Sequence, residues 1–341
     1  MSTAQMRKLT RRSLLQGFIA TALLPSLSDG LRAQTAPLPS WAEGHAKQSI
    51  LDFVSRVTLP GNADFVPPPE RIAVFDNDGT LWAEKPVYFQ VVFSIDRMKA
   101  LAPQHPGWAN RQPIKSLLAG DFKTALAEGG QKAIAEAVGV AYANVTTDAF
   151  TGSVLDWIAT ARHPRFGRPY TELVYQPMLE LLAYLRDNGF KTFIVSGGGI
   201  EFMRPWVDDV YGIPPEQVVG SSGVTTFRFT EGKPELIKEA KIEFVDDGPG
   251  KPVGINRFIG RRPILAFGNS DGDQQMLEWT AAGNGPSFMA LIHHTDAKRE
   301  WAYDRNSDVG RLNTALEEAR ARNWLVVDMA HDWKRVFPFD N

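Results

Sequence analysis

Short apolar runs alternate with longer amphipathic stretches along most of this chain of 341 residues. The run at 72–75 contains Ile, Ala, Val and Phe, which is typical of a strand buried on both faces. Similar runs recur at 191–195, 217–220, 263–267 and 288–292. Because strands that alternate with helices form parallel sheets, the pattern predicts an α/β fold with a doubly wound, Rossmann-like parallel sheet.

Apolar residues at helical spacing predict the helices that cover this sheet. The predicted helices lie at 41–59, 177–188, 202–210 and 274–282, and the tail at 298–322 is predicted to be largely helical. The pattern at residues 224–247 predicts an extended hairpin around a charged turn. The pattern at 324–329 predicts a last element at the edge of the sheet.

Residues 86–170 interrupt the alternation of strands and helices. They are mainly helical in pattern, with Ala-rich stretches at 116–143 and no strong strand. A crossover between parallel strands needs a single helix, so the additional residues predict a helical cap inserted after the first strand. The predicted core then comprises residues 34–85 and 171–341.

Polar clusters follow three of the predicted strands. They consist of Asp76 and Asp78 after the first strand, Ser196 after the second, and Asn269 and Asp273 after the fourth. The carboxyl ends of parallel strands meet at one edge of the sheet, where open α/β sheets bind their ligands. The sequence therefore predicts one site made from all three clusters.

The residue types indicate phosphoryl transfer. A carboxylate such as Asp76 can attack phosphorus and form an aspartyl-phosphate. Asp78 can then protonate the leaving oxygen and later help to deprotonate water, which requires a raised pKa. Because phosphate and carboxylate repel each other, we expect a Mg²⁺ cofactor with oxygen ligands from Asp76, the backbone carbonyl of Asp78 and the fourth-strand cluster.

The phosphate itself requires neutralising groups. Ser196 and the amides of Gly197 and Gly198 are expected to hold phosphate oxygens at a helix N-terminus. Lys251 lies in a loop rich in Gly and Pro before the fourth strand, and we expect it to supply the positive charge.

Taken in order, these motifs resemble those of the haloacid dehalogenase-like (HAD) hydrolase superfamily, nearest to its phosphoserine-phosphatase-like branch with a helical cap. The resemblance covers about residues 70–295 and rests on Asp76-Asn77-Asp78-Gly79-Thr80, Ser196, Lys251 and the segment 268–273. It implies Asp76 as nucleophile, Asp78 as acid/base, and Ser196 and Lys251 as phosphate ligands.

The chain departs from this family at Asn269, where the family usually has an acidic Mg²⁺ ligand. Asparagine can coordinate through its carbonyl oxygen but supplies no charge. We hypothesise that Asn269 coordinates and Asp273 supports it from close by. Asp271 is the alternative ligand if spacing alone decides.

The N-terminus indicates export. Arg11 and Arg12 precede an apolar run at 17–27, a pattern typical of a twin-arginine signal over residues 1–33. The run is shorter than a typical membrane span, so no stable span is expected after processing, and we expect a periplasmic or secreted location. The net charge is −2, which gives no argument for nucleic acid, and there is no cysteine for a thiolate site.

The leading hypothesis is an exported, Mg²⁺-dependent phosphomonoesterase acting on a small phosphorylated metabolite. A phosphotransferase using the same intermediate, or a catalytically impaired phosphate-ester binding protein, are the alternatives. Aromatic residues in or beside the predicted cap, among them Trp82, Phe93 and Trp157, predict a core for that cap rather than a quaternary ammonium cage. His293 and His294 are expected to be structural, because adjacent residues of a strand face opposite sides.

Overall fold

The computed structural model describes residues 37–340. The predicted twin-arginine signal at 1–33 lies outside the described residues. No helix within 37–340 is both long and apolar enough to cross a membrane.

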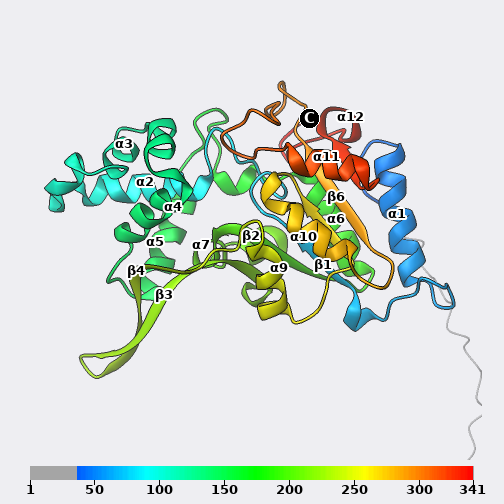
Figure 1. Ribbon diagram of the computed structural model, residues 1–341, viewed down its shortest axis with the longest axis horizontal. Coiled ribbons are helices and arrows are strands. Elements are labelled where there is room, and N and C mark those ends of the chain that lie inside the picture. Colours follow the sequence, from blue (N-terminus) through cyan, green and yellow to red (C-terminus); the bar gives the residue numbers. More distant parts are fainter. Residues whose placement is uncertain (1–36, 341) are drawn as a thin grey trace, which may run out of the picture. The chain divides into compact units, whose positions relative to one another are not determined.

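The core is a seven-stranded sheet with the strand order β4-β3-β2-β1-β5-β6-β7 (Figure 1). All neighbours pair in parallel except β3 and β4, which form an antiparallel hairpin. The strands are β1 (Ile72–Phe75), β2 (Lys191–Gly199), β3 (Val218–Thr230), β4 (Lys233–Phe244), β5 (Leu265–Gly268), β6 (Phe288–His293) and β7 (Leu325–Asp328).

Successive side chains of the parallel strands enter two separate cores. In β1, Ala73 and Phe75 belong to one core, whereas Ile72 and Val74 belong to the other. Helices cover both faces, so the predicted doubly wound α/β sheet is confirmed. The first core includes residues of α1 (His45–Thr58), α6 (Gln176–Asp187) and α8 (Val207–Tyr211), and the second residues of α10 (Gln274–Ala281) and α11 (Thr314–Ala321).

A helical insert follows β1, as predicted. It contains α2 (Phe89–Leu101), α3 (Ile114–Leu118), α4 (Phe122–Ala141) and α5 (Thr147–Thr160). Its centre is aromatic, because the Phe93 ring lies 5.3 Å from that of Tyr142 and 5.6 Å from that of Trp157. These rings are buried against one another and so form the core of the insert.

The β3–β4 hairpin packs against the helical insert and forms backbone hydrogen bonds with it. The sequence did not indicate this contact. The Asn144 amide donates to the Lys238 carbonyl at 2.8 Å, and the Lys238 amide donates to the Val145 carbonyl at 2.9 Å. The predicted strand at 217–220 and the first arm of the predicted hairpin form one strand, β3. It pairs in parallel with β2 from Val218 to Ser221, and its antiparallel pairing with β4 begins at Ser222 rather than at 224.

Two predicted helices differ from the structure. The helix predicted at 202–210 is divided into α7 (Ile200–Met203) and α8 because Pro205 cannot donate the hydrogen bond that would continue α7. The tail predicted as helical from 298 to 322 is irregular until α11 begins at Thr314.

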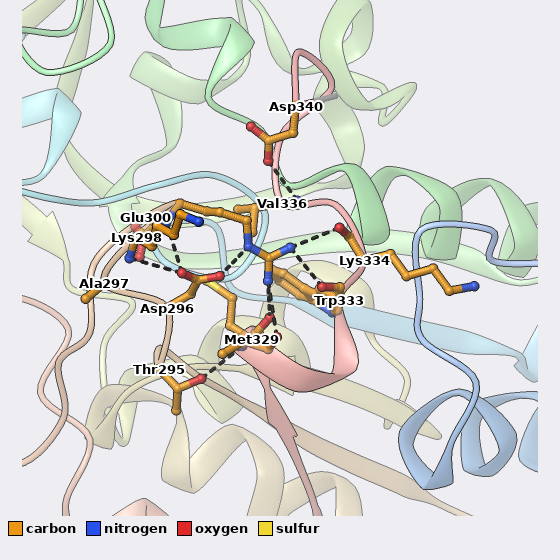
Figure 2. A network of polar contacts seen from close by, with 12 residues as sticks. Thr295, Asp296, Ala297, Lys298, Glu300, Met329, Trp333, Lys334, Val336 and Asp340 are labelled. Atoms are coloured by element: carbon orange, nitrogen blue, oxygen red, sulfur yellow. Dashed lines mark hydrogen bonds and ion pairs between the residues drawn. The ribbon is translucent and has the colours of Figure 1, made fainter.

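The irregular segment before α11 is held by side chains instead of helical hydrogen bonds. Arg299 pairs with Asp296 and donates to the carbonyls of Met329, Trp333 and Lys334 (Figure 2). The Asp296 carboxylate also accepts hydrogen bonds from the Lys298 and Arg299 amides. This network fixes the loop that follows β6 to the C-terminal segment, and the same loop reaches the candidate site.

Candidate active site

Asp76 directly follows the central strand β1 and contacts Lys251 from the start of α9 (Gly250–Gly254). The Asp76 Oδ1 atom accepts a hydrogen bond of 2.7 Å from Lys251 Nζ. The same ammonium group donates to the Val195 carbonyl at 2.8 Å and to Asp273 Oδ1 at 2.6 Å. All three of its donors are thereby used, which fixes the positive charge beside Asp76.

The charges of this group perturb one another. Burial raises the pKa of Asp76, and the Asp273 carboxylate raises it further, whereas Lys251 opposes the increase. Burial lowers the pKa of Lys251, but Asp273 and Asp76 outweigh this effect and keep its pKa above the ordinary value. Lys251 is therefore a permanent cation in this site.

The two acids of the fourth-strand motif have different surroundings. Asp273 is fully buried; its Oδ1 accepts from Lys251, and its Oδ2 accepts from the amides of Asn269 and Ser270 at 2.9 and 3.0 Å. These contacts favour a supporting role for Asp273 over direct coordination. Asp271 accepts from the amides of Asn313 and Ala315 at 2.7 and 3.0 Å, where α11 begins, so it is engaged in capping that helix.

Asp78 lines the same cavity as Asp76. Its Oδ1 accepts a hydrogen bond of 2.9 Å from Trp82 Nε1. Burial raises the pKa of Asp78 to about 6, although the Trp82 hydrogen bond partly opposes this shift. A carboxyl group with this pKa can both release and take up a proton near neutral pH.

The loop at Ser196 differs from the predicted helix N-terminus. β2 continues through this loop to Gly199, and α7 has four residues. The Gly198 amide donates to Ser196 Oγ at 3.1 Å, and the Gly199 amide donates to Gln90 Oε1 of α2 at 2.6 Å. Ser196 and Gly197 line the cavity, while Gln90 connects the insert to the end of β2.

Asn269 has a partner that sequence reasoning missed. Its Oδ1 accepts a hydrogen bond of 3.0 Å from Thr80 Oγ1, and its Nδ2 donates to Glu84 Oε1 at 2.9 Å. Glu84 Oε1 also accepts from the Tyr303 hydroxyl at 2.7 Å. No local pattern marks Tyr303 as a site residue, and the position of Glu84, a short distance after Asp76, is only a weak signal.

The oxygen-rich donor set fits a divalent cation. Asp76 and Asp273 pair with Lys251, whereas Asp78 and Glu84 receive hydrogen bonds from neutral groups, so the cluster holds four carboxyl groups and one ammonium group. Burial raises the pKa of Glu84 as well. Within residues 37–340, no three His, Cys, Asp or Glu side chains group into a metal site, so a cation here would require backbone or amide oxygens as well as carboxylates.

A cavity of about 550 Å³ joins these groups to the insert. Asp76, Asp78, Ser196 and Lys251 lie at its polar end. Its remaining wall is largely apolar and includes Val91, Phe122, Leu126, Tyr142, Phe150, Phe202, Ile242 and Val245. The cavity has the size of a small-molecule site with its polar groups at one end.

The two histidines lie outside the catalytic cluster. His294 is buried; its Nε2 lies 2.8 Å from the Gly79 carbonyl, and its Nδ1 lies 3.2 Å from Glu300. It therefore connects the loop after β6 to the loop that carries Asp78. His293 lies 3.7 Å from Asp304.

Together these features define a class: α/β proteins with a carboxylate-based site at the carboxyl edge of a parallel sheet and a helical insert after the first strand. The chain belongs to the haloacid dehalogenase-like hydrolase family, which it matches over residues 73–278. The superfamily expected from its motifs is thus confirmed. Comparison with curated protein sequences finds no match.

Solved structures with a similar fold include three bacterial proteins. A conserved protein of unknown function from Anaerococcus prevotii DSM 20548 is 15% identical over 83% of this chain and 90% of its own, with a TM-score of 0.53. A protein of unknown function from Bordetella pertussis Tohama I is 14% identical over 76% and 99%, with a TM-score of 0.49. A phosphoserine phosphohydrolase-like protein from Francisella tularensis subsp. tularensis SCHU S4 is 16% identical over 67% and 89%, with a TM-score of 0.37. Of the three, the Anaerococcus prevotii protein alone has a TM-score above 0.5, and at 15% identity its likeness concerns the fold alone.

Proposed function

We propose that this protein is an exported, Mg²⁺-dependent phosphomonoesterase that acts on small phosphate esters through an aspartyl-phosphate on Asp76. The observation that carries the proposal is the Lys251 ammonium group between Asp76 and Asp273, at the polar end of the cavity. Family membership supports a hydrolase, and the residue types support phosphoryl transfer.

Asp76 and Asp78 divide the chemistry. Lys251 holds Asp76 Oδ1, and the other carboxylate oxygen attacks phosphorus while the bond from phosphorus to the ester oxygen breaks. Asp78 donates its proton to the departing alkoxide, which leaves as the alcohol. In the second step Asp78 accepts a proton from water as the water oxygen attacks phosphorus, and inorganic phosphate and free Asp76 are formed. A pKa of about 6 suits Asp78 to both transfers.

The remaining groups bind and orient the phosphate. Ser196 and Gly197 line the cavity near Lys251, where they can contact phosphate oxygens. Asp76, the Asp78 carbonyl and Asn269 are the proposed Mg²⁺ ligands, with Asp273 in support. When bound, Mg²⁺ offsets the repulsion between the Asp76 carboxylate and the phosphate.

The cavity supports a phosphate ester whose alcohol part is apolar. Its wall away from Asp76 contains Phe122, Tyr142 and Phe150, which favour apolar contact over hydrogen bonding. We therefore expect aryl and alkyl phosphates to have a higher kcat/KM than phosphoserine. Steady-state kinetics on a matched panel of esters measures this, and equal values would contradict an apolar alcohol site.

The direct test is release of p-nitrophenol from its phosphate ester, with and without Mg²⁺. Wild type should turn over with Mg²⁺, and Asp76→Asn should reduce kcat by at least ~10³-fold, because the nucleophile is lost. Asp271→Asn is the matched control, since this acid caps α11 rather than lining the polar end of the cavity. Ester binding without turnover would favour the binding-protein alternative, and a phosphorylated alcohol product would favour phosphotransfer.

Export by the twin-arginine route is part of the proposal and rests on Arg11 and Arg12 before the apolar run. Replacing both arginines by lysine should retain the full-length chain in the cytoplasm of a bacterial host. Fractionation followed by immunoblotting measures this, and unchanged appearance in the periplasm would contradict the route.

A further inference from the structure

The mechanism above leaves one buried carboxylate of the cavity unused. Glu84 is 1% exposed and lines the cavity together with Asp76 and Asp78. A buried charge is costly unless other groups compensate for it, so a carboxylate in this position requires a physical reason.

The backbone around Glu84 is shaped to admit it. Gly79 and Gly310 have φ of +76° and +65°, and both face the Glu84 carboxylate. A Cβ atom at Gly79 would lie 2.5 Å from Glu84 Oε1, and one at Gly310 would lie 1.7 Å from it. Both loops can approach this oxygen only because they carry no side chain at these positions.

Glu84 determines the orientation of the Asn269 amide. Glu84 Oε1 accepts hydrogen bonds from the Tyr303 hydroxyl and from the Asn269 NH₂ group, so that NH₂ group faces Glu84. That contact is 2.9 Å long. The carbonyl oxygen of Asn269 then faces away from Glu84, where it accepts one hydrogen bond from Thr80 and retains a second lone pair.

We propose that Glu84 is a positioning residue for the cation site. It holds Asn269 so that the amide carbonyl oxygen is the one available to a divalent cation, and it supplies the negative charge that the amide lacks. Outer groups that orient a metal ligand and increase its basicity strengthen metal binding. The inference rests on the proposed function, because it assumes a cation beside Asp76.

The simpler reading is that Glu84 only fastens the Tyr303 loop to the segment after β1. Lys85 and Tyr88 also contact that loop, through the Val309 carbonyl at 2.9 Å and the Gly310 amide at 3.2 Å. If Glu84 only fastens the loop, its replacement should lower stability and leave the cation affinity unchanged. If Glu84 is a positioning residue, its replacement should weaken cation binding and leave the stability unchanged.

The test measures Mn²⁺ binding to the full chain by electron paramagnetic resonance, with Mg²⁺ as competitor, and thermal unfolding in chelator. Glu84→Gln should weaken Mn²⁺ binding at least tenfold and leave the unfolding temperature in chelator close to that of wild type, because glutamine keeps the size of the side chain and one acceptor oxygen. Glu300→Gln is the matched control, because Glu300 is equally buried and lies in the loop that carries Tyr303, but it pairs with His294. Its Mn²⁺ affinity should stay within threefold of wild type.

A second variant moves the carboxylate instead of removing it. Glu84→Gln combined with Asn269→Asp should bind Mn²⁺ more tightly than Glu84→Gln alone, because a carboxylate then takes the place of the Asn269 amide beside the cation. Unchanged affinity in Glu84→Gln, or no recovery in the double variant, would overturn the inference. If wild type binds no Mn²⁺ at all, the cation site fails, and the proposed function fails with it.

Discussion

Lys251 contacts three acceptors, and two of them are buried carboxylates from different parts of the chain, Asp76 and Asp273. The ion pairs join the end of β1 to the loop after β5 through a residue of α9. Such a group is costly to assemble but far more costly to break, because each carboxylate would remain buried without a counter-charge.

Replacing Lys251 by methionine should therefore lower the stability of the fold and abolish turnover. We expect the free energy of unfolding to fall by ~3–5 kcal/mol, the range for breaking a buried ion pair. Urea denaturation in chelator measures this. Lys334→Met, whose side chain is 51% exposed, is the control and should change stability by less than ~1 kcal/mol. An unfolding free energy equal to that of wild type would contradict the ion-pair account.

Asp246 is another buried carboxyl group, and it is fully inaccessible to solvent. Within residues 37–340, neither of its oxygens has a hydrogen-bond partner. Burial raises the pKa of Asp246 to about 7, although the charge of Lys251 opposes the increase. Between the ordinary value and this pKa the folded chain holds a proton that the unfolded chain releases, so stability falls as pH rises through this window.

Asp246→Asn should remove this pH dependence. Its stability relative to wild type should increase by ~2–4 kcal/mol between pH 4 and pH 8, since each pKa unit corresponds to ~1.4 kcal/mol. Urea unfolding at both pH values measures the difference, with Asp52→Asn on the exposed side of α1 as control. A difference that does not depend on pH would show that Asp246 is ionised in both states.

At the scale of elements, the helical insert has a core of its own. The Phe93 ring contacts Tyr142, Phe150 and Trp157, which come from different parts of the insert, and Phe202, which comes from α7. The same insert provides Gln90, whose side-chain oxygen accepts a hydrogen bond from the Gly199 amide beside the candidate site. Packing within the insert therefore shapes both the apolar wall and the polar end of the cavity.

Phe93→Ala should loosen the insert while the sheet remains folded. Loss of a buried aromatic side chain costs ~3–5 kcal/mol, which exceeds what a small helical unit can lose and stay ordered. Hydrogen exchange should become faster in α4 and α5 but not in β1 or β5. Phe229→Ala at the exposed end of the hairpin is the control. Equal exchange rates in the insert of both variants would argue against an aromatic core there.

At the scale of the whole described chain, Arg299 connects the loop after β6 to the C-terminal segment (Figure 2). That loop in turn provides Glu300, which contacts His294, and Tyr303, which contacts Glu84. Residues far from the cavity thereby determine how one side of the site is held.

Arg299→Lys should lower the melting temperature although the charge is retained. Lysine cannot reproduce the planar fork that reaches several carbonyl groups, and each lost charged hydrogen bond contributes ~1.5–3 kcal/mol. Differential scanning calorimetry measures the change, and Arg320→Lys on the exposed side of α11 is the control. A melting temperature equal to that of the control would contradict a structural role for the network.

Much of the site could be anticipated from local sequence. In the sequence, Asp76, Asp78 and Ser196 follow apolar runs that read as strands, and Lys251 lies in a segment rich in Gly and Pro. Residues that follow parallel strands converge at one edge of the sheet. The structure places Lys251 in α9 rather than in a loop. Glu84, Gln90 and Tyr303 could not be found in this way. Their positions depend on how loops and helices pack, and no short-range pattern encodes such contacts.

The sequence alone determined the sheet, its helical insert and the family. A buried strand and the polar residues that follow it are neighbours in the sequence, so a local pattern is enough to identify them. Only the tertiary structure showed which partners each acidic side chain of the fourth-strand motif contacts. Asp271 and Asp273 belong to one motif, yet one caps α11 and the other holds Lys251. Tertiary structure also placed Glu84 against Asn269 and joined the hairpin to the insert, since contacts between distant segments form only when the whole chain has packed.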